Sequence, residues 1–139
     1  EYDWPWYGEL VGAYFMSHPA QQEAALNIVD PNNISTRHLP AVWKKSDEWY
    51  NFKWIYEDLH VLITIDENSY GLNGKKGGQN GAYHPMAWYH EYDGGRAFYT
   101  EFGHDKQYVE NPLFIQHLLG GIKYAMGAKP KDQLSVAVK

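Results

Sequence analysis

The feature that most constrains the fold is the run from His60 to Ile65, which is apolar at nearly every position. A strand with one face in water alternates apolar and polar residues, whereas a continuous apolar run is typical of a strand covered on both faces. Such strands are characteristic of α/β domains. The run therefore predicts an inner strand of an α/β sheet, and 139 residues are enough for one domain of this kind.

A β-hairpin is expected later in the chain. Residues 85–92 alternate in character, Asp93-Gly94 provides a turn, and residues 96–100 return as a second strand. Asp-Gly between two such runs is a strong local hairpin signal. Because neighbouring residues of a strand point to opposite faces, His90 and Glu91 should not act together as a ligand pair.

The best-defined helix is expected over residues 112–126. Asn111 is a good N-cap, Pro112 suits the first helical position, and Gly127 stands where a C-terminal glycine belongs. The pair Gly120-Gly121 lowers helix propensity by about 1 kcal/mol per residue relative to alanine. The pair therefore predicts close packing of this helix against a neighbour.

The other elements carry weaker signals. A helix is predicted from Pro5 to Phe15, with its cap at Asp3, because apolar residues recur there at helical spacing. Residues 25–29 read as a short strand. The segment from Asn68 to Tyr83 contains five glycines and is expected to be a mobile loop.

Composition excludes several classes of function. The chain has no cysteine, so disulfides, thiolate zinc sites and cysteine nucleophiles are excluded. Its net charge is -5, which argues against a nucleic-acid partner. No apolar run approaches the roughly 20 residues that a membrane-spanning helix needs. Aromatic residues make up 17% of the chain, and such rings can stack on the apolar faces of sugars.

Two polar clusters at the ends of predicted elements are candidates for chemistry. Asp47 and Glu48 are neighbouring acids that could work as general acid and base if their pKa values differ, or could be a solvated capping pair. His104 follows Gly103 after a predicted strand, a position that suits proton transfer or a structural cap equally. His18 lies near the end of the first predicted helix, where a structural role is the simpler interpretation. No spacing in the chain supports a metal site.

Several motifs, taken in order, resemble the later part of a ThuA-like (trehalose utilisation) domain. They are Glu1-Tyr2-Asp3-Trp4-Pro5-Trp6-Tyr7, Asp47-Glu48-Trp49-Tyr50-Asn51-Phe52, His84-Pro85-Met86-Ala87-Trp88-Tyr89-His90-Glu91-Tyr92, Gly95-Arg96-Ala97-Phe98-Tyr99-Thr100, Gly103-His104-Asp105 and Leu119-Gly120-Gly121-Ile122-Lys123-Tyr124-Ala125. The resemblance covers residues 1–127 as the C-terminal portion of such a domain, with 128–139 as a tail or linker.

The resemblance implies a flavodoxin-like three-layer α/β sandwich related to class I glutamine amidotransferases. It further implies that the N-terminal strands of the domain precede residue 1, so a sheet edge and an apolar face should need cover from that part or from self-association. His104 resembles in position the histidine of the amidotransferases, with Asp105 beside it. Their catalytic cysteine has no counterpart in a chain without cysteine, so glutaminase activity is not expected.

The resemblance also implies a pocket at the carboxyl ends of the strands. Its expected lining is His18, Asp47, Glu48, His90 and His104, with Trp49 and Trp88 as apolar walls that would contact a sugar.

Three functions follow from this reading. The first is a carbohydrate-processing enzyme that acts on a disaccharide, with His104 as general acid/base and Asp47 or Glu48 as its partner. The second is a non-catalytic carbohydrate-binding module, and the third is a scaffold domain. The resemblance favours an exported bacterial protein and leaves the cofactor open.

Overall fold

The structure, a computed structural model, describes residues 3–71 and 80–131. In chain order its elements are α1 (Pro5–Val11), β1 (Ala13–Ser17), β2 (Gln22–Ile28), β3 (Val42–Asp47), β4 (Asn51–Ile55), β5 (His60–Ile65), the 3-10 helix η1 (Glu67–Ser69), β6 (Pro85–Tyr92), β7 (Gly95–Thr100), α2 (Lys106–Val109) and α3 (Pro112–Ala125). Half of the predicted mobile loop from Asn68 to Tyr83, residues 72–79, lies outside the described residues, and Asn68 and Ser69 belong to η1.

The chain has a mixed α/β fold with two antiparallel sheets. Five strands form one sheet in the order β3-β2-β5-β6-β7, and β1 pairs with β4 in a separate two-stranded ribbon. Every strand pair within residues 3–71 and 80–131 is antiparallel. The parallel strands of a flavodoxin-like sandwich are thus not seen in this part of the chain. The edges of the larger sheet are β3 and β7.

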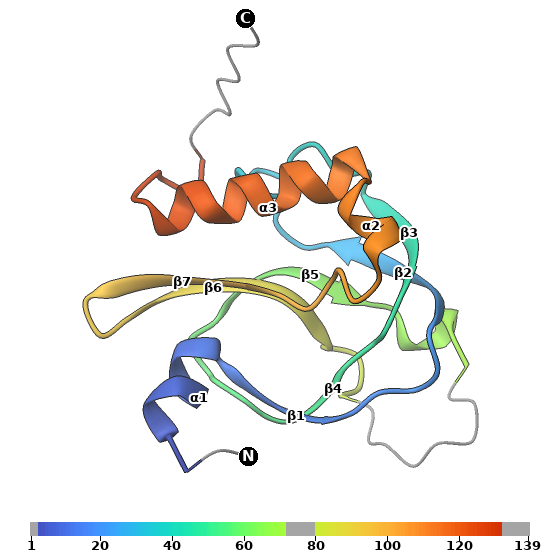
Figure 1. Ribbon diagram of the computed structural model, residues 1–139, viewed down its shortest axis with the longest axis horizontal. Coiled ribbons are helices and arrows are strands. Elements are labelled where there is room, and N and C mark those ends of the chain that lie inside the picture. The colour runs from blue at the N-terminus through green and yellow to red at the C-terminus, as the bar shows by residue number, and fades with distance from the viewer. Residues whose placement is uncertain (1–2, 72–79, 132–139) are drawn as a thin grey trace, which may run out of the picture.

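The larger sheet is covered on both faces. Helix α3 lies over one face, and the β1–β4 ribbon with α1 lies across the other (Figure 1). Strand β5 is in the middle of the sheet, and its residues Leu62, Ile63 and Ile65 are almost completely buried. The prediction of an inner strand at His60–Ile65 is confirmed.

The hairpin and the last helix are confirmed as well. Strands β6 and β7 pair around Asp93 and Gly94, whose φ values of 49° and 75° are those of the tight hairpin turn. Helix α3 begins at Pro112, and the side chain of Asn111 accepts a hydrogen bond from the N–H of Leu113 at 2.9 Å. Strand β2 includes most of the strand predicted over 25–29.

The predicted first helix is wrong in its second half and at its cap. Helix α1 ends at Val11 because Gly12 has a φ of 90°, a left-handed conformation that ends the helix. Tyr14 and Phe15 then belong to strand β1, which pairs with β4. The residue at the N-cap is Trp4 rather than Asp3, and it makes no side-chain capping bond.

Candidate functional site

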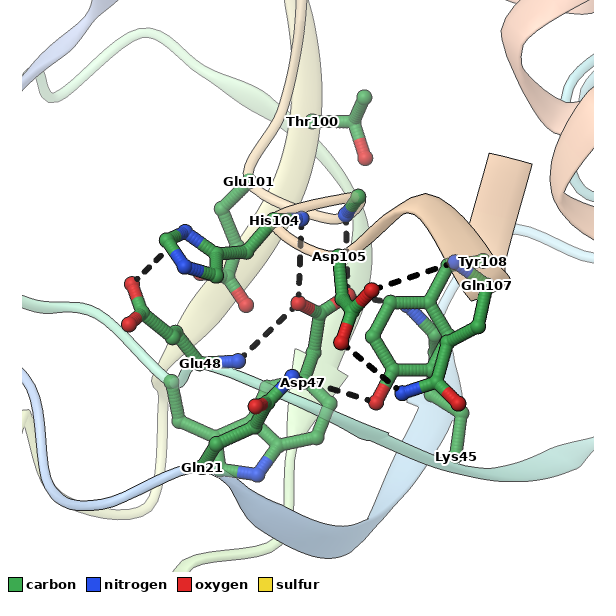
Figure 2. A network of polar contacts seen from close by, with 12 residues as sticks. Gln21, Lys45, Asp47, Glu48, Thr100, Glu101, His104, Asp105, Gln107 and Tyr108 are labelled. Carbon is green, nitrogen blue, oxygen red and sulfur yellow. Dashed lines mark hydrogen bonds and ion pairs between the residues drawn. The ribbon is translucent and has the colours of Figure 1, made fainter.

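Asp47 is a buried anchor at the end of β3. Its Oδ2 accepts a hydrogen bond from the N–H of Gly103 at 2.9 Å, and its Oδ1 accepts one from the N–H of His104 at 3.3 Å. The N–H of Glu48 donates to the same Oδ1 at 3.0 Å. Its side chain is completely buried and shows no ligand-facing surface. Asp47 therefore fixes the loop after β7 to the end of β3, and so sets the position of His104 (Figure 2).

The charge of Asp47 is balanced by Lys45, two residues earlier on the same face of β3. The Lys45 Nζ donates to Asp47 Oδ2 at 2.5 Å. The ammonium also lies 4.7 Å from the ring centroids of both Phe102 and Tyr108, within the range of cation–π attraction. Burial lowers the pKa of Lys45, and the bond to Asp47 opposes that change. The pair is a buried structural ion pair.

Glu48 lies between two histidines, and we name Glu48, His18 and His104 the Glu48 cluster. Its Oε2 is 3.2 Å from Nδ1 of His104, and its Oε1 is 3.8 Å from Nδ1 of His18. The side chain of Glu48 is 17% exposed, while His104 is 53% exposed and His18 is 30% exposed. The cluster is therefore open to solvent on the histidine side.

This geometry gives the His104 ring a defined chemical capacity. Nδ1 of His104 faces the Glu48 carboxylate, so in the tautomer with its proton on Nδ1 the carboxylate would meet that N–H and Nε2 would carry the lone pair. A carboxylate that holds an imidazole in this tautomer also stabilises the imidazolium formed when Nε2 takes a proton. Glu48 rather than Asp47 is thus the side-chain partner of His104.

An aromatic cavity of about 390 Å³ lies between α1, the β1–β4 ribbon and β7. Most of its lining is aromatic, and we use this name for the space lined by Trp4, Tyr7, Tyr14, Phe15, Tyr50, Phe52 and Tyr99 with smaller neighbours. The His18 ring lies 6.0 Å from the rings of both Phe15 and Tyr50. The cavity and the Glu48 cluster are therefore adjacent.

Tyr50 connects the two parts of the site. Its ring lines the cavity, and burial together with the nearby charge of Glu48 raises the pKa of its hydroxyl. Tyr99, which also lines the cavity, stacks on Trp88 with ring centroids 4.2 Å apart. Burial and the charge of Glu101 raise the pKa of Tyr99 as well, so both phenols stay protonated. A hydrogen bond to Glu48 is among the causes that raise the pKa of Tyr50.

Three residues expected in the pocket lie elsewhere. Trp49 and Trp88 are completely buried, and their indole N–H groups donate to the carbonyls of Gln22 and Val11 at 2.9 Å. Neither ring offers a face to a sugar. The prediction that Trp49 and Trp88 form the walls of a sugar pocket is therefore wrong, and both residues pack in the core. His90 is buried against α1, with Nε2 2.9 Å from the carbonyl oxygen of Leu10, and is separate from the Glu48 cluster.

Sequence reasoning missed the aromatic wall and one acid. The wall residues come from α1 and its N-cap, from β1, from β4 and the residue before it, and from β7, and their convergence depends on how the ribbon crosses the sheet. Glu101 follows β7 two residues after Tyr99, and strand alternation could have placed both on one face. Its side chain is buried, and Oε2 accepts the N–H of Tyr50 at 3.3 Å.

The described residues contain no group of three or more His, Asp or Glu side chains arranged to hold a metal ion. In the same ranges no helix combines the length and the apolar character needed to cross a bilayer.

Comparison with known proteins gives one family and two solved structures. A family model described as ThuA, trehalose utilisation, matches residues 1–125. A ThuA-like protein from Bacteroides uniformis ATCC 8492 superposes with a TM-score of 0.70 and 22% identity, over 88% of this chain and 51% of that one. A ThuA-like protein from Parabacteroides merdae ATCC 43184 gives a TM-score of 0.59 and 23% identity, over 89% and 51%. The chain spans about half the length of each, and at these identities the likeness shows the fold alone. No curated protein matches the chain.

Proposed function

This chain belongs to the ThuA family, and on that premise we propose that it carries a carbohydrate site made of the aromatic cavity and the Glu48 cluster. The proposed reaction is acid–base chemistry on a sugar, with His104 as the proton-transferring group and Glu48 as its orienting carboxylate. The observation that carries the proposal is the 3.2 Å contact between Glu48 and the His104 ring beside an aromatic cavity.

The cavity suits a sugar in both size and chemistry. Its volume of about 390 Å³ falls at the lower end of ordinary ligand sites, which measure about 300–1,000 Å³. Aromatic rings pack well against the C–H faces of a pyranose, and tyrosine hydroxyls can bond its hydroxyl groups. Trp4 and Phe15 are partly exposed at this cavity, so they replace the buried Trp49 and Trp88 as the proposed stacking platforms.

The proposed proton transfer uses the residues of the Glu48 cluster. Nε2 of His104 takes a proton from a sugar hydroxyl, and the imidazolium that forms is stabilised by Glu48 through Nδ1. His18 adds a second imidazole next to the cavity; its Nδ1 is 2.8 Å from the carbonyl oxygen of Pro19 and 3.8 Å from the other oxygen of Glu48. The flavodoxin-like sandwich and its relation to amidotransferases remain part of the proposal for the complete domain.

The alternative is a site that binds sugar without altering it. The observation in its favour is that the described cavity wall has no charged side chain, and that the His104 ring is more than half exposed. Binding and chemistry can be separated by variants that change one part of the site only.

Binding is tested by calorimetric titration of the protein with trehalose and a panel of other disaccharides. Trp4→Ala should weaken binding about tenfold, the order expected for loss of one aromatic contact in a ligand site. Tyr83→Ala is the matched control, since Tyr83 is 59% exposed against 55% for Trp4 and is not part of the cavity wall. Equal affinity of the two variants, or no heat with any sugar, would contradict the proposed site.

Chemistry is tested with His104→Asn and product analysis by NMR. The enzyme reading predicts that sugar binding survives in this variant while turnover falls by about 100-fold or more. Binding without turnover in the unaltered protein across the whole panel would favour the non-catalytic alternative.

A further inference from the structure

Tyr50, which links the aromatic cavity to the Glu48 cluster, is held by side chains at both of its peptide groups. Its N–H donates to Oε2 of Glu101 at 3.3 Å, and its carbonyl oxygen lies 2.8 Å from Nε2 of His84. The His84 side chain is completely buried. Tyr50 lines the cavity and stands two residues after Glu48, so the contact at its carbonyl bears on both parts of the site.

The His84 ring meets an acceptor at each of its nitrogens. Nε2 faces the carbonyl oxygen of Tyr50, and Nδ1 lies 2.9 Å from Oε1 of Glu67 in η1. A carbonyl oxygen only accepts, so Nε2 must carry a proton to bond Tyr50. Oε1 of Glu67 also accepts the N–H of Gly81 at 2.9 Å. Both contacts of the ring are hydrogen bonds at the same time only when a second proton lies between Nδ1 and Oε1, as it does when the ring is an imidazolium.

A neutral His84 ring has one N–H and must give up one of the two contacts. A hydrogen bond from an N–H to a carboxylate is charge-assisted and is roughly twice as strong as a bond to a neutral carbonyl. The neutral ring therefore keeps its proton on Nδ1, bonded to Glu67, and turns the lone pair of Nε2 toward the carbonyl oxygen of Tyr50. Because two facing lone pairs repel, a neutral His84 releases Tyr50.

The surroundings of His84 allow the second proton to be exchanged. Among the described residues, the charge that acts on the pKa of His84 is that of Glu67. Tyr70, which follows η1, stays a neutral phenol because burial, Glu67 and Glu101 raise its pKa to about 12. Burial lowers the pKa of His84 from the ordinary 6.5, and the bonds to Tyr50 and Glu67 oppose that change. The second proton is therefore bound in acidic solution and is lost as the pH rises.

We propose that His84 is a positioning residue of the site, which holds the Tyr50 carbonyl only while both nitrogens of its ring are protonated. This inference rests on the proposed carbohydrate site and deepens it, because it makes sugar binding stronger in acidic solution. His84 is buried and is not part of the cavity wall, so it acts through Tyr50 and not by touching the sugar.

The first test uses the protein without sugar, in NMR spectra recorded from about pH 4 to 8, which covers the usual spread of histidine pKa values. Both ring nitrogens of His84 should be protonated at the acidic end, and Nε2 should lose its proton as the pH rises. The carbonyl carbon signal of Tyr50 should shift with the same midpoint. In Glu67→Gln that midpoint should move to lower pH, since the charge of Glu67 raises the pKa of His84. A Tyr50 signal that does not follow the His84 ring would overturn the inference.

The second test compares the affinity for trehalose at about pH 5 and about pH 8, between which a histidine changes its charge. His84→Gln can still donate to the Tyr50 carbonyl but does not titrate. Affinity of the unaltered protein should gain about fivefold more on acidification than affinity of His84→Gln, the order of one hydrogen bond. His60→Gln, which removes an exposed histidine outside the site, is the control and should keep the full gain. An equal gain in the unaltered protein and in His84→Gln would contradict the positioning role.

The two tests separate this inference from the proposed function. If trehalose binds but Tyr50 does not respond to the His84 ring, the inference is wrong and the carbohydrate site stands. If no disaccharide binds, the proposed function fails and the positioning role fails with it, even where the NMR titration shows that His84 holds Tyr50. If His84→Gln does not fold, the NMR titrations of the unaltered protein and of Glu67→Gln decide.

Discussion

Replacing Asp47 by Asn tests whether this residue acts through structure or through chemistry. The carboxylate accepts hydrogen bonds from Lys45 and from the N–H groups of Glu48, Gly103 and His104. The Asn side chain keeps one oxygen as an acceptor, but its NH2 group replaces the other oxygen. That NH2 group is a donor and would face the N–H or ammonium donors that now bond to Asp47. The substitution also removes the counter-charge that is hydrogen-bonded to the buried Lys45 ammonium. Breaking a buried ion pair on one side costs about 3–5 kcal/mol.

We expect Asp47→Asn to lower the free energy of unfolding at pH 7 by about 3 kcal/mol, the lower end of that range, because the aromatic rings around Lys45 still attract its charge. The loss should shrink as pH rises, since burial lowers the pKa of Lys45 and a neutral amine needs no counter-charge. For a domain whose total stability is about 5–15 kcal/mol this is a large fraction. Urea unfolding followed by tryptophan fluorescence measures it.

Two comparisons make the result specific. Asp105→Asn changes the same charge on the same loop, but Asp105 caps α2 through the N–H of Gln107, and Asn caps equally well, so the change should stay below about 0.5 kcal/mol. Lys45→Met combined with Asp47→Asn should recover more than about 1 kcal/mol relative to the sum of the single changes. Unaltered stability in Asp47→Asn with loss of turnover would refute the anchoring role and restore Asp47 as an acid or base of the reaction.

The remaining predictions concern the packing of α3. Burial lowers the pKa of His117 to about 4, below the 6.5 of an unfolded histidine, so its contribution is complete above about pH 6.5 and is lost as pH falls toward 4. Between these two pH values the free energy of unfolding should fall by about 3 kcal/mol because of His117. In His117→Gln this fall should be absent from the pH dependence of the urea midpoint. A Cβ on Gly120 would lie 2.4 Å from Cα of Ser35, so Gly120→Ala should lower stability by about 1–3 kcal/mol despite its better helix propensity. Gln116→Ala, on the exposed side of the same helix, should leave the melting temperature unchanged or slightly higher, and equal melting temperatures for the two variants would contradict the close contact.

The elements that could be predicted are those with local causes. The turn at Asp93-Gly94, the cap at Asn111 and the apolar run of β5 each depend on a few neighbouring residues, and all three are found where expected. The prediction of the first helix was wrong in its second half because the apolar residues Tyr14 and Phe15 fit either a helix face or a half-buried strand. Pairing of β1 with β4, from nearly 40 residues away, decided between them.

The residues of the candidate site also include some that could be predicted from the sequence and some that could not. Glu48 and His104 were identified because they follow the ends of predicted elements, and the structure brings their side chains into contact. Asp47 was identified with them, yet its side chain turns inward and bonds backbone groups instead. Trp49 and Trp88 have the right chemistry for a sugar platform, but whether a tryptophan is exposed depends on what packs over it.

The residue order of this chain was enough to establish its family resemblance, its β5 strand, its hairpin and its last helix, because composition, capping and turn chemistry act over a few residues. Antiparallel pairing, the burial of Asp47 and Glu101, and the gathering of aromatic rings from α1, β1, β4 and β7 were decided by tertiary structure alone. Burial and electrostatic environment are properties of neighbours that lie far away in the sequence. The raised pKa of Glu101, caused first by its burial and then by the charge of Asp47, therefore follows only from the folded chain.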